Sequence, residues 1–82
     1  MKAIVYSKLE CPYCEKVKTI LFHCNIEYIE YVYGKDFIRD QFYAKFGNGS
    51  TFPQVILDDK HVGGCTDTVK YLKEQNLFRI IQ

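Results

Sequence analysis

The sequence predicts an α/β fold in which four strands and three helices follow one another in the order β-α-β-α-β-β-α. Short apolar, β-branched runs alternate with segments in which apolar residues recur at helical spacing. One pair of strands is separated by a helix, which gives a parallel pair, and another by a tight turn, which gives an antiparallel pair. We therefore expect a four-stranded mixed sheet with three flanking helices.

The first three elements are expected to form a βαβ unit. The apolar, β-branched run from Lys2 to Ser7 predicts a strand. A helix is expected from Pro12 to about Cys24, because proline is favoured in the first helical turn and apolar residues then recur every three or four positions. Ile26 to Tyr33 is rich in Ile, Tyr and Val and predicts a second strand, which Gly34 ends.

The segment from Lys35 to Phe46 predicts the second helix. Ile38, Phe42 and Phe46 lie four residues apart and are expected to form its buried stripe. The segment 47–49, Gly-Asn-Gly, is a strong signal for the end of a helix, and a loop should follow.

The last third of the chain predicts a hairpin and a helix. The strands Gln54 to Leu57 and His61 to Val62 are separated by the tight turn 58–60, so they should pair antiparallel. Gly63 and Gly64 end the second of these strands. The final helix is expected to be capped by Cys65 or Thr66, with a buried stripe of Val69, Leu72 and Leu77.

Length and charge restrict the chain to a single small domain, expected to span residues 1–82. The formal net charge is +1, with 11 basic and 10 acidic residues, which argues against the basic face of a nucleic-acid-binding protein. No run approaches the roughly 18 apolar residues of a membrane span or forms a signal-peptide core. We expect a cytoplasmic monomer that binds neither nucleic acid nor membranes.

Two of the four cysteines occupy a position suited to redox chemistry. Cys11 and Cys14 stand between a buried strand and the first turn of a helix, the context in which Cys-x-x-Cys indicates thiol exchange. The helix N-terminus stabilises an anion, so Cys11 should ionise more easily than a free thiol of pKa about 8.5 and act as the nucleophile. Lys8 adds positive charge nearby. Cys14 is placed to attack a mixed disulfide formed at Cys11.

The same cysteine pair could also be half of a zinc site. His23, Cys24, His61 or Cys65 would then complete the four ligands. A structural zinc site usually pairs two Cys-x-x-Cys knuckles, and this chain has one. His23 and Cys24 are adjacent on a helix and point in different directions, and Cys24 falls on the buried stripe, where we expect a small core residue.

Two further segments gain meaning only in combination with the cysteine pair. Thr51-Phe52-Pro53 precedes a strand, where proline offers no hydrogen-bond donor, and alone it indicates a turn or an edge. The segment from Gly63 to Asp67 joins two glycines to a helix N-terminus, whose N–H groups can bind a carboxylate. Alone it indicates a strand-to-helix turn.

Together these three segments resemble the glutaredoxin family, and the match in order and spacing covers essentially the whole chain. The segment 11–14, Cys-Pro-Tyr-Cys, is the tetrapeptide of dithiol glutaredoxins. Thr51-Phe52-Pro53 is similar to the family's Thr-Val-Pro with its cis proline, and residues 63–67 match its Gly-Gly-x-x-Asp. The resemblance implies a thioredoxin fold, glutathione as the reductant, and the reduction of protein disulfides and glutathione mixed disulfides. Ribonucleotide reductase is the protein partner that the family suggests.

The resemblance also implies a role for each site residue. Cys11 would be the nucleophile and Cys14 the resolving thiol, and the two would form the redox-active disulfide. Phe52 would pair its backbone with the cysteinyl part of glutathione, beside Pro53. The other implied glutathione contacts are Lys8 at the glycine carboxylate, Tyr13 and Thr51 along the groove, Gly64, Cys65 and Thr66 at the γ-glutamyl end, and Asp67 as the acceptor for the ammonium group. No metal is implied.

Two other functions remain open from the sequence. One is a redoxin recharged by thioredoxin reductase, and the other is a binding module for zinc or for an iron–sulfur cluster bridged between two chains. Tyr13 and the Gly-Gly-x-x-Asp segment favour glutathione, and Pro12 disfavours the cluster, because relatives that hold clusters usually lack it. Many relatives carry an arginine where this chain has Ser50, and Arg39 or Gln41 could supply the second-helix contact to glutathione.

Overall fold

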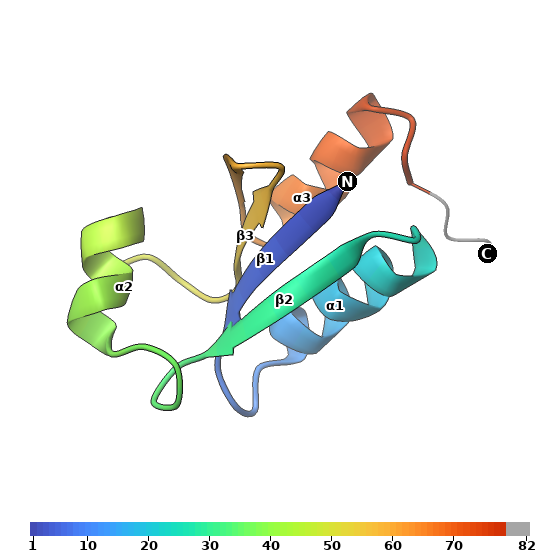
Figure 1. Cartoon of the computed structure of the whole chain (residues 1–82). Helices are drawn as coiled ribbons and strands as arrows, with labels where there is room; N and C mark the ends of the chain where they lie inside the picture. Colours follow the sequence, from blue (N-terminus) through green and yellow to red (C-terminus); the bar gives the residue numbers. More distant parts are fainter. Residues whose placement is uncertain (79–82) are drawn as a thin grey trace.

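A computed structural model, which describes residues 1–78, has the predicted α/β architecture (Figure 1). Residues 79–82 of the expected domain lie outside the described part. The elements are β1 (Lys2–Ser7), α1 (Pro12–His23), β2 (Glu27–Val32), α2 (Arg39–Phe46), β3 (Gln54–Leu57), β4 (Lys60–Gly63) and α3 (Cys65–Glu74). The sheet has the order β2-β1-β3-β4, with β1 parallel to β2 and antiparallel to β3, and β4 antiparallel to β3. The mixed four-stranded sheet is confirmed.

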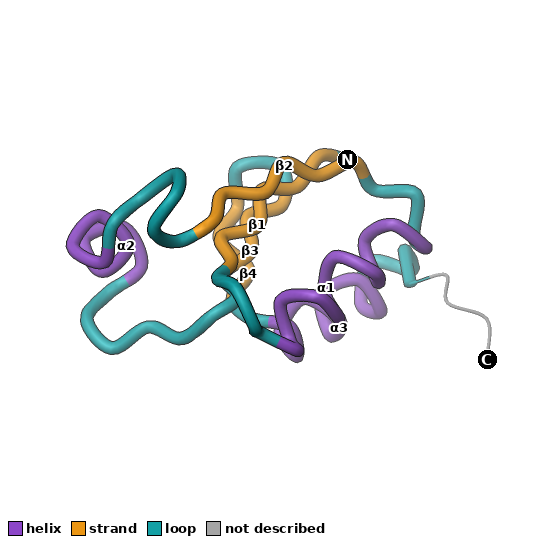
Figure 2. The backbone as a smooth tube through the Cα atoms, turned by 90° about the horizontal axis from the view of Figure 1, so that it is seen from below, coloured by secondary structure: helices purple, strands orange, loops and turns teal. Residues whose placement is uncertain are grey.

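One face of the sheet carries the main core. Figure 2 shows α1 and α3 side by side on this face, with α2 on the other side of the sheet. Alternate residues of β1 and β3 point toward α1 and α3, as the two-residue period of a strand requires. The core residues with at most 1% of their surface exposed include Ala3, Val5, Val17, Leu21, Val55, Leu57 and Leu72.

On the opposite face, aromatic rings attach α2 to the sheet. We call five of these residues the aromatic cluster: Tyr6, Phe37, Phe42, Phe46 and Phe52. The ring centroids of Tyr6 and Phe46 are 4.9 Å apart, and those of Phe42 and Phe52 are 4.2 Å apart. Tyr6 belongs to β1, whereas Phe42 and Phe46 belong to α2, so the cluster bridges sheet and helix.

The second helix begins later than predicted. It starts at Arg39 instead of Lys35, because the residues after β2 form a hydrogen-bonded turn. The amide groups of Lys35 and Asp36 both donate to the carbonyl of Val32, and the Asp36 carboxylate accepts the Val32 N–H at 2.8 Å. This Asp side chain satisfies the backbone in a turn, which competes with helix formation.

The predicted buried stripe of that helix is wrong at one position. Ile38 is 59% exposed and caps the helix, and its N–H donates to the side chain of Gln41. Phe37, which precedes the helix, is buried in its place. Phe42 is buried and Phe46 half-buried, as the four-residue spacing predicted.

Other element boundaries shift by a residue or two. The first helix ends at His23, with Cys24 as its C-cap. Compared with the prediction, β2 is one residue shorter at each end and β4 is one residue longer at each end. The cap of α3 is Gly64 and not Cys65 or Thr66. Leu77 lies beyond the end of α3 but still packs on the core beside Leu72. Among the described residues no helix has the length and apolar character needed to cross a membrane.

Candidate active site

Cys11 and Cys14 lie at the junction between β1 and α1. The loop 8–10 connects Ser7 to Cys11, which is the N-cap of α1, and Pro12 occupies the first helical position. The two cysteines form a disulfide, with their Cα atoms 5.2 Å apart. Cys11 is 7% exposed and Cys14 is fully buried. Cys11 is therefore the more accessible cysteine of the pair.

The backbone at this junction is arranged to stabilise a negatively charged sulfur. The Cys14 N–H donates to Cys11 Sγ at 3.2 Å, and the Glu15 N–H donates to the Cys11 carbonyl at 3.1 Å. Unpaired N–H groups and the helix dipole favour an anion at this position. Cys11 is therefore the sulfur of the pair better suited to be a thiolate, and the arrangement can carry out thiol–disulfide exchange.

A groove of about 530 Å³ lies next to the cysteine pair. Three segments that are far apart in the sequence line it: Tyr13 in α1, residues 51–53 before β3, and residues 63–67 at the start of α3. We call it the first groove. The peptide bond between Phe52 and Pro53 is cis, as the resemblance predicted. Of the predicted glutathione contacts, only Lys8 does not line this groove. Those that line it are Tyr13, Thr51, Phe52, Pro53, Gly64, Cys65, Thr66 and Asp67.

Lys8 lies at the edge of the site. Its side chain is exposed, and Nζ is 5.7 Å from the centroid of the Phe52 ring, within the range of a cation–π contact. Phe52 in turn stacks on Phe42 of the aromatic cluster. The ammonium group of Lys8 is thus associated with the first groove through the Phe52 ring.

The opposite end of the first groove is formed by the turn into α3. The Gly64 N–H donates to Asp67 Oδ2 at 3.4 Å. Gly63 has φ +122°, and a Cβ atom added there would lie 2.5 Å from the same carboxylate oxygen. Glycine is therefore required at position 63, because any side chain would displace Asp67.

Sequence reasoning missed the polar pair that forms part of the groove wall. Gln54 and His61 both line the groove, and Gln54 Oε1 lies 2.7 Å from His61 Nε2. The signal in the sequence was a polar residue at the first position of an apolar strand. Ser50, which replaces the arginine of many relatives, also lines the groove, and its hydroxyl donates to the Phe46 and Gly47 carbonyls. The structure does not place Arg39 or Gln41 among the lining residues.

Sequence reasoning also missed a charged network beneath the cysteine loop. Glu30 on β2 accepts a hydrogen bond from the Ser7 hydroxyl at 2.6 Å and from Lys18 Nζ at 2.8 Å, and Lys18 also pairs with Glu15. Burial alone would raise the pKa of Glu30, but the bonds from Lys18 and Ser7 hold it below its ordinary value. Burial likewise opposes the charge of Lys18, yet its two carboxylate partners raise its pKa. The network ties α1 to β1 and β2.

The remaining two cysteines have different surroundings. Cys24 is buried in the main core, as predicted. Cys65 opens α3 and borders the first groove, and burial raises the pKa of its thiol. Within residues 1–78, no group of three or more His, Cys, Asp or Glu side chains is arranged to hold a metal ion.

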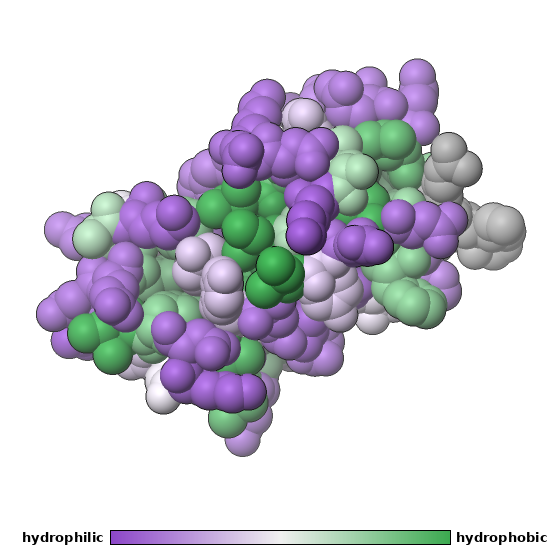
Figure 3. Space-filling view, viewed as in Figure 1, coloured by the Kyte–Doolittle hydropathy of each residue, from purple (hydrophilic) through white to green (hydrophobic). Residues whose placement is uncertain are grey.

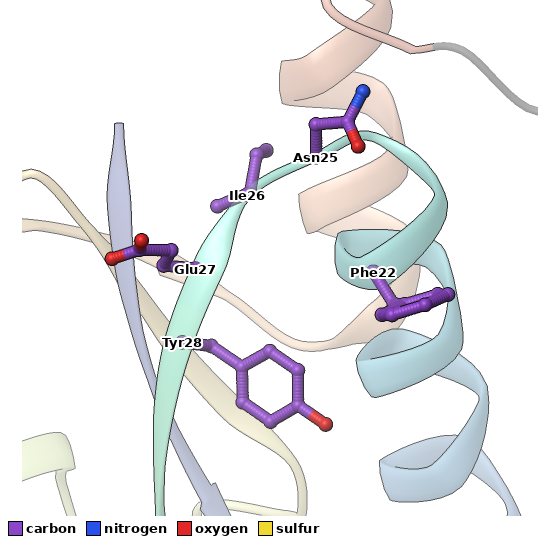
Figure 4. A pocket seen from close by; sticks show the side chains of 5 residues that line it. All are labelled: Phe22, Asn25, Ile26, Glu27 and Tyr28. Carbon is purple, nitrogen blue, oxygen red and sulfur yellow. The ribbon is translucent and has the colours of Figure 1, made fainter.

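Another hollow, of about 500 Å³, lies near the end of α1 that is remote from the cysteine pair (Figure 4). Phe22 on α1 and Tyr28 on β2 lie on its two sides, and the carboxylate of Glu27 points away from them. Asn25 and Ile26 complete its lining. This hollow contains no nucleophile or acid–base pair, so the candidate chemistry lies at the cysteines.

Comparisons with known proteins point to one family. The family model described as Glutaredoxin matches residues 3–62. Glutaredoxin 1 of Rickettsia prowazekii (strain Madrid E) is 37% identical over 81 residues, covering 96% of this chain and 85% of that protein. The crystal structure of glutaredoxin 1 from Francisella tularensis complexed with cacodylate superposes with a TM-score of 0.74 at 31% identity, covering 93% and 95% of the two chains. The crystal structure of a buckwheat glutaredoxin–glutathione complex superposes with a TM-score of 0.63 at 27% identity, covering 92% and 71%. The expected thioredoxin fold is confirmed.

Proposed function

Because this chain belongs to the glutaredoxin family of thiol–disulfide oxidoreductases, we propose that it uses glutathione to reduce protein disulfides and glutathione mixed disulfides. The observation that carries the proposal is the Cys11–Cys14 pair at a helix N-terminus, beside a groove with charged and hydrogen-bonding groups at both ends. Cys11 is the nucleophile and Cys14 the resolving thiol in this proposal.

Reduction of a protein disulfide proceeds in two exchanges. The Cys11 thiolate attacks one sulfur of the substrate, which forms a mixed disulfide and releases the other substrate sulfur as a thiolate. Cys14, after losing its proton, attacks Cys11 Sγ, which forms the intramolecular disulfide and releases the second substrate thiolate. Two electrons pass from the dithiol to the substrate, and both released thiolates take up protons from water.

Glutathione then restores the dithiol. One glutathione thiolate attacks Cys11 Sγ and releases Cys14, and a second attacks the sulfur of the bound glutathione, which yields glutathione disulfide and the Cys11 thiolate. Attack by Cys11 on a glutathione mixed disulfide enters this sequence directly at the bound glutathione. Such a substrate therefore requires Cys11 alone.

The charges around the first groove match those of the tripeptide. The γ-glutamyl carboxylate would meet the N–H groups at the start of α3, at Cys65 and Thr66, and its ammonium group would meet Asp67. Lys8 would face the glycine carboxylate, and the Phe52 backbone would pair with the cysteinyl residue. A buckwheat glutaredoxin with 27% sequence identity was crystallised in complex with glutathione, which supports glutathione as the ligand.

A coupled assay tests this proposal. Reduction of cysteinyl-glutathione is followed with NADPH, glutathione and glutathione reductase, and in parallel with NADPH and thioredoxin reductase. We expect turnover in the first system only. The substitution Asp67→Asn should raise the KM for glutathione roughly tenfold, because it weakens a charge-assisted hydrogen bond. Turnover only with thioredoxin reductase would overturn the proposal, and stoichiometric zinc or iron in anaerobically purified protein would indicate a metal-binding module instead.

The proposal extends to the partner and the setting. The protein substrates are disulfide-containing or glutathionylated proteins, among which ribonucleotide reductase is the one that the family suggests. The enzyme acts as a monomer in the reducing cytoplasm, where glutathione is available.

A further inference from the structure

A second groove lies between α1 and α3, adjacent to the first. It has a volume of about 490 Å³. Its lining residues are Tyr13 and Lys16 from α1 and Cys65, Thr66, Val69, Lys70, Lys73 and Glu74 from α3. Tyr13, Cys65 and Thr66 line both grooves, so the two grooves are neighbours on the surface. Figure 2 shows the two helices running side by side.

The second groove concentrates positive charge in a chain that is almost neutral overall. Lys16, Lys70 and Lys73 are all exposed, and Glu74 is the one acidic residue in the lining. Among the described residues, none of the three lysines forms an ion pair within the chain. Lys73 Nζ lies 5.2 Å from the centroid of the Phe78 ring, a contact that leaves its charge unneutralised. All three ammonium charges can therefore attract carboxylates of another molecule.

Apolar surface lies among these charges. The Tyr13 side chain is 61% exposed, and Val69 is half-buried. A ring that is exposed on one side and rigidly attached to a helix is well suited to contact an apolar side chain of a partner. The second groove thus offers an apolar surface bordered by ammonium groups.

We propose that the second groove binds the polypeptide next to the target cysteine of protein disulfides, and selects segments in which acidic residues accompany an apolar one. This inference rests on the proposed function. A protein joined to Cys11 through its cysteine continues in both chain directions, so the segment on one side of that cysteine can pass Tyr13 and enter the second groove. Glutathione occupies the first groove in the proposed mechanism, and a small mixed disulfide has no residues that extend into the second. The second groove therefore acts on protein substrates alone.

The test compares two peptides that share one intramolecular disulfide and a neighbouring leucine, flanked by glutamates in one peptide and by lysines in the other. Prereduced protein is mixed with each peptide in single turnover, so that glutathione is not needed. At low ionic strength we expect the acidic peptide to react roughly tenfold faster, and we expect the preference to shrink as salt screens the charges. The variant Lys70→Glu should lower the rate for the acidic peptide about three- to tenfold.

A matched variant separates local charge from net charge. Lys2→Glu changes the net charge by the same amount, at the start of β1, away from the groove-lining residues. It should leave both peptide rates within about twofold, and both variants should reduce cysteinyl-glutathione at the wild-type rate. Equal rates for the two peptides, or equal losses in the Lys70→Glu and Lys2→Glu variants, would overturn the inference. Failure of the wild type to turn over cysteinyl-glutathione would instead refute the proposed function.

Discussion

Truncation of Phe42 to alanine should loosen the attachment of α2 to the sheet, because this ring is the buried residue of the helix. Phe42 is 1% exposed. Its ring stacks on Phe52 at 4.2 Å between centroids, and the centroids of Phe46 and Phe37 are 5.1 and 5.5 Å away. Phe52 also borders the first groove, so the same truncation should loosen the proposed glutathione site.

The loss of stability follows from the size and burial of the ring. Removing a fully buried phenylalanine side chain costs about 3–5 kcal/mol, which includes the cavity that remains. A domain of this length has a total stability of roughly 4–12 kcal/mol. With an unfolding entropy of about 2.1 cal/mol/K per residue, the melting temperature should fall by roughly 15–30 °C. Phe42→Ala is therefore expected to be partly unfolded at 37 °C.

Urea and thermal unfolding followed by circular dichroism measure this effect, with Phe22→Ala as the matched control. Phe22 is 71% exposed, and its truncation should change the free energy of unfolding by no more than about 0.5 kcal/mol. If Phe42→Ala lost less than about 1 kcal/mol, the aromatic cluster would not be what holds α2 in place.

Three further predictions concern the surroundings of the site. Because the pKa of Glu30 is lowered, its carboxylate stabilises the fold above about pH 4.5, and this contribution is lost as the pH falls through the folded-state pKa. The difference in the free energy of unfolding between wild type and Glu30→Gln should therefore shrink from about pH 7 to about pH 3 in urea titrations. A constant difference would argue against the pair with Lys18. Gly63→Ala should cost roughly 1–3 kcal/mol and raise the KM for glutathione, because the new Cβ displaces Asp67; an unchanged KM would contradict the assigned role of that carboxylate. Because Cys65 is buried and its pKa is raised, its thiol in the reduced protein should react with iodoacetamide at neutral pH at least about tenfold more slowly than free cysteine. Peptide mass spectrometry measures this rate. Equal rates would show an accessible thiol.

Local signals in the sequence were sufficient for most of the fold and for the position of the cysteine pair. Pro12 after Cys11 marks a helix start, and the two-residue and helical periods of the apolar residues identify the strands and helices. The hairpin of β3 and β4 follows from its short turn. These features depend on neighbours in the chain, so they can be read without a structure.

The start of α2 could not be predicted, because two local preferences compete there. The helical spacing predicts that Ile38 is buried. In the structure the Asp36 side chain closes a turn, so that the helix begins only at Arg39 and Phe37 is buried instead. Sequence periodicity does not show whether these residues form a helix or a turn. The outcome depends on the aromatic cluster, whose members Tyr6 and Phe52 come from other strands and loops.

The supporting network and the groove wall could not be predicted for a different reason. Ser7, Lys18 and Glu30 meet only because of the parallel register of β1 with β2 and the rotation of α1 above them. Gln54 and His61 meet across β3 and β4, where the register is irregular. Both arrangements are tertiary, and neither leaves a motif in the sequence.

Figure 3 shows one side of the molecule, where apolar residues lie among charged ones. The second groove lies between α1 and α3. Three lysines separated in the sequence come together there because α1 and α3 lie side by side. The near-neutral total charge therefore conceals a local excess of positive charge on one side of the molecule.

The roles of the two cysteines are tested most directly by the coupled glutathione assay on Cys14→Ser and Cys11→Ser, with cysteinyl-glutathione and a protein disulfide as substrates. Cys14→Ser should keep most of the wild-type rate on cysteinyl-glutathione and lose most of the protein disulfide reduction, because the resolving thiol is needed only for the latter. Cys11→Ser should lose both activities. Loss of both activities in Cys14→Ser, or retention of either in Cys11→Ser, would contradict the assignment.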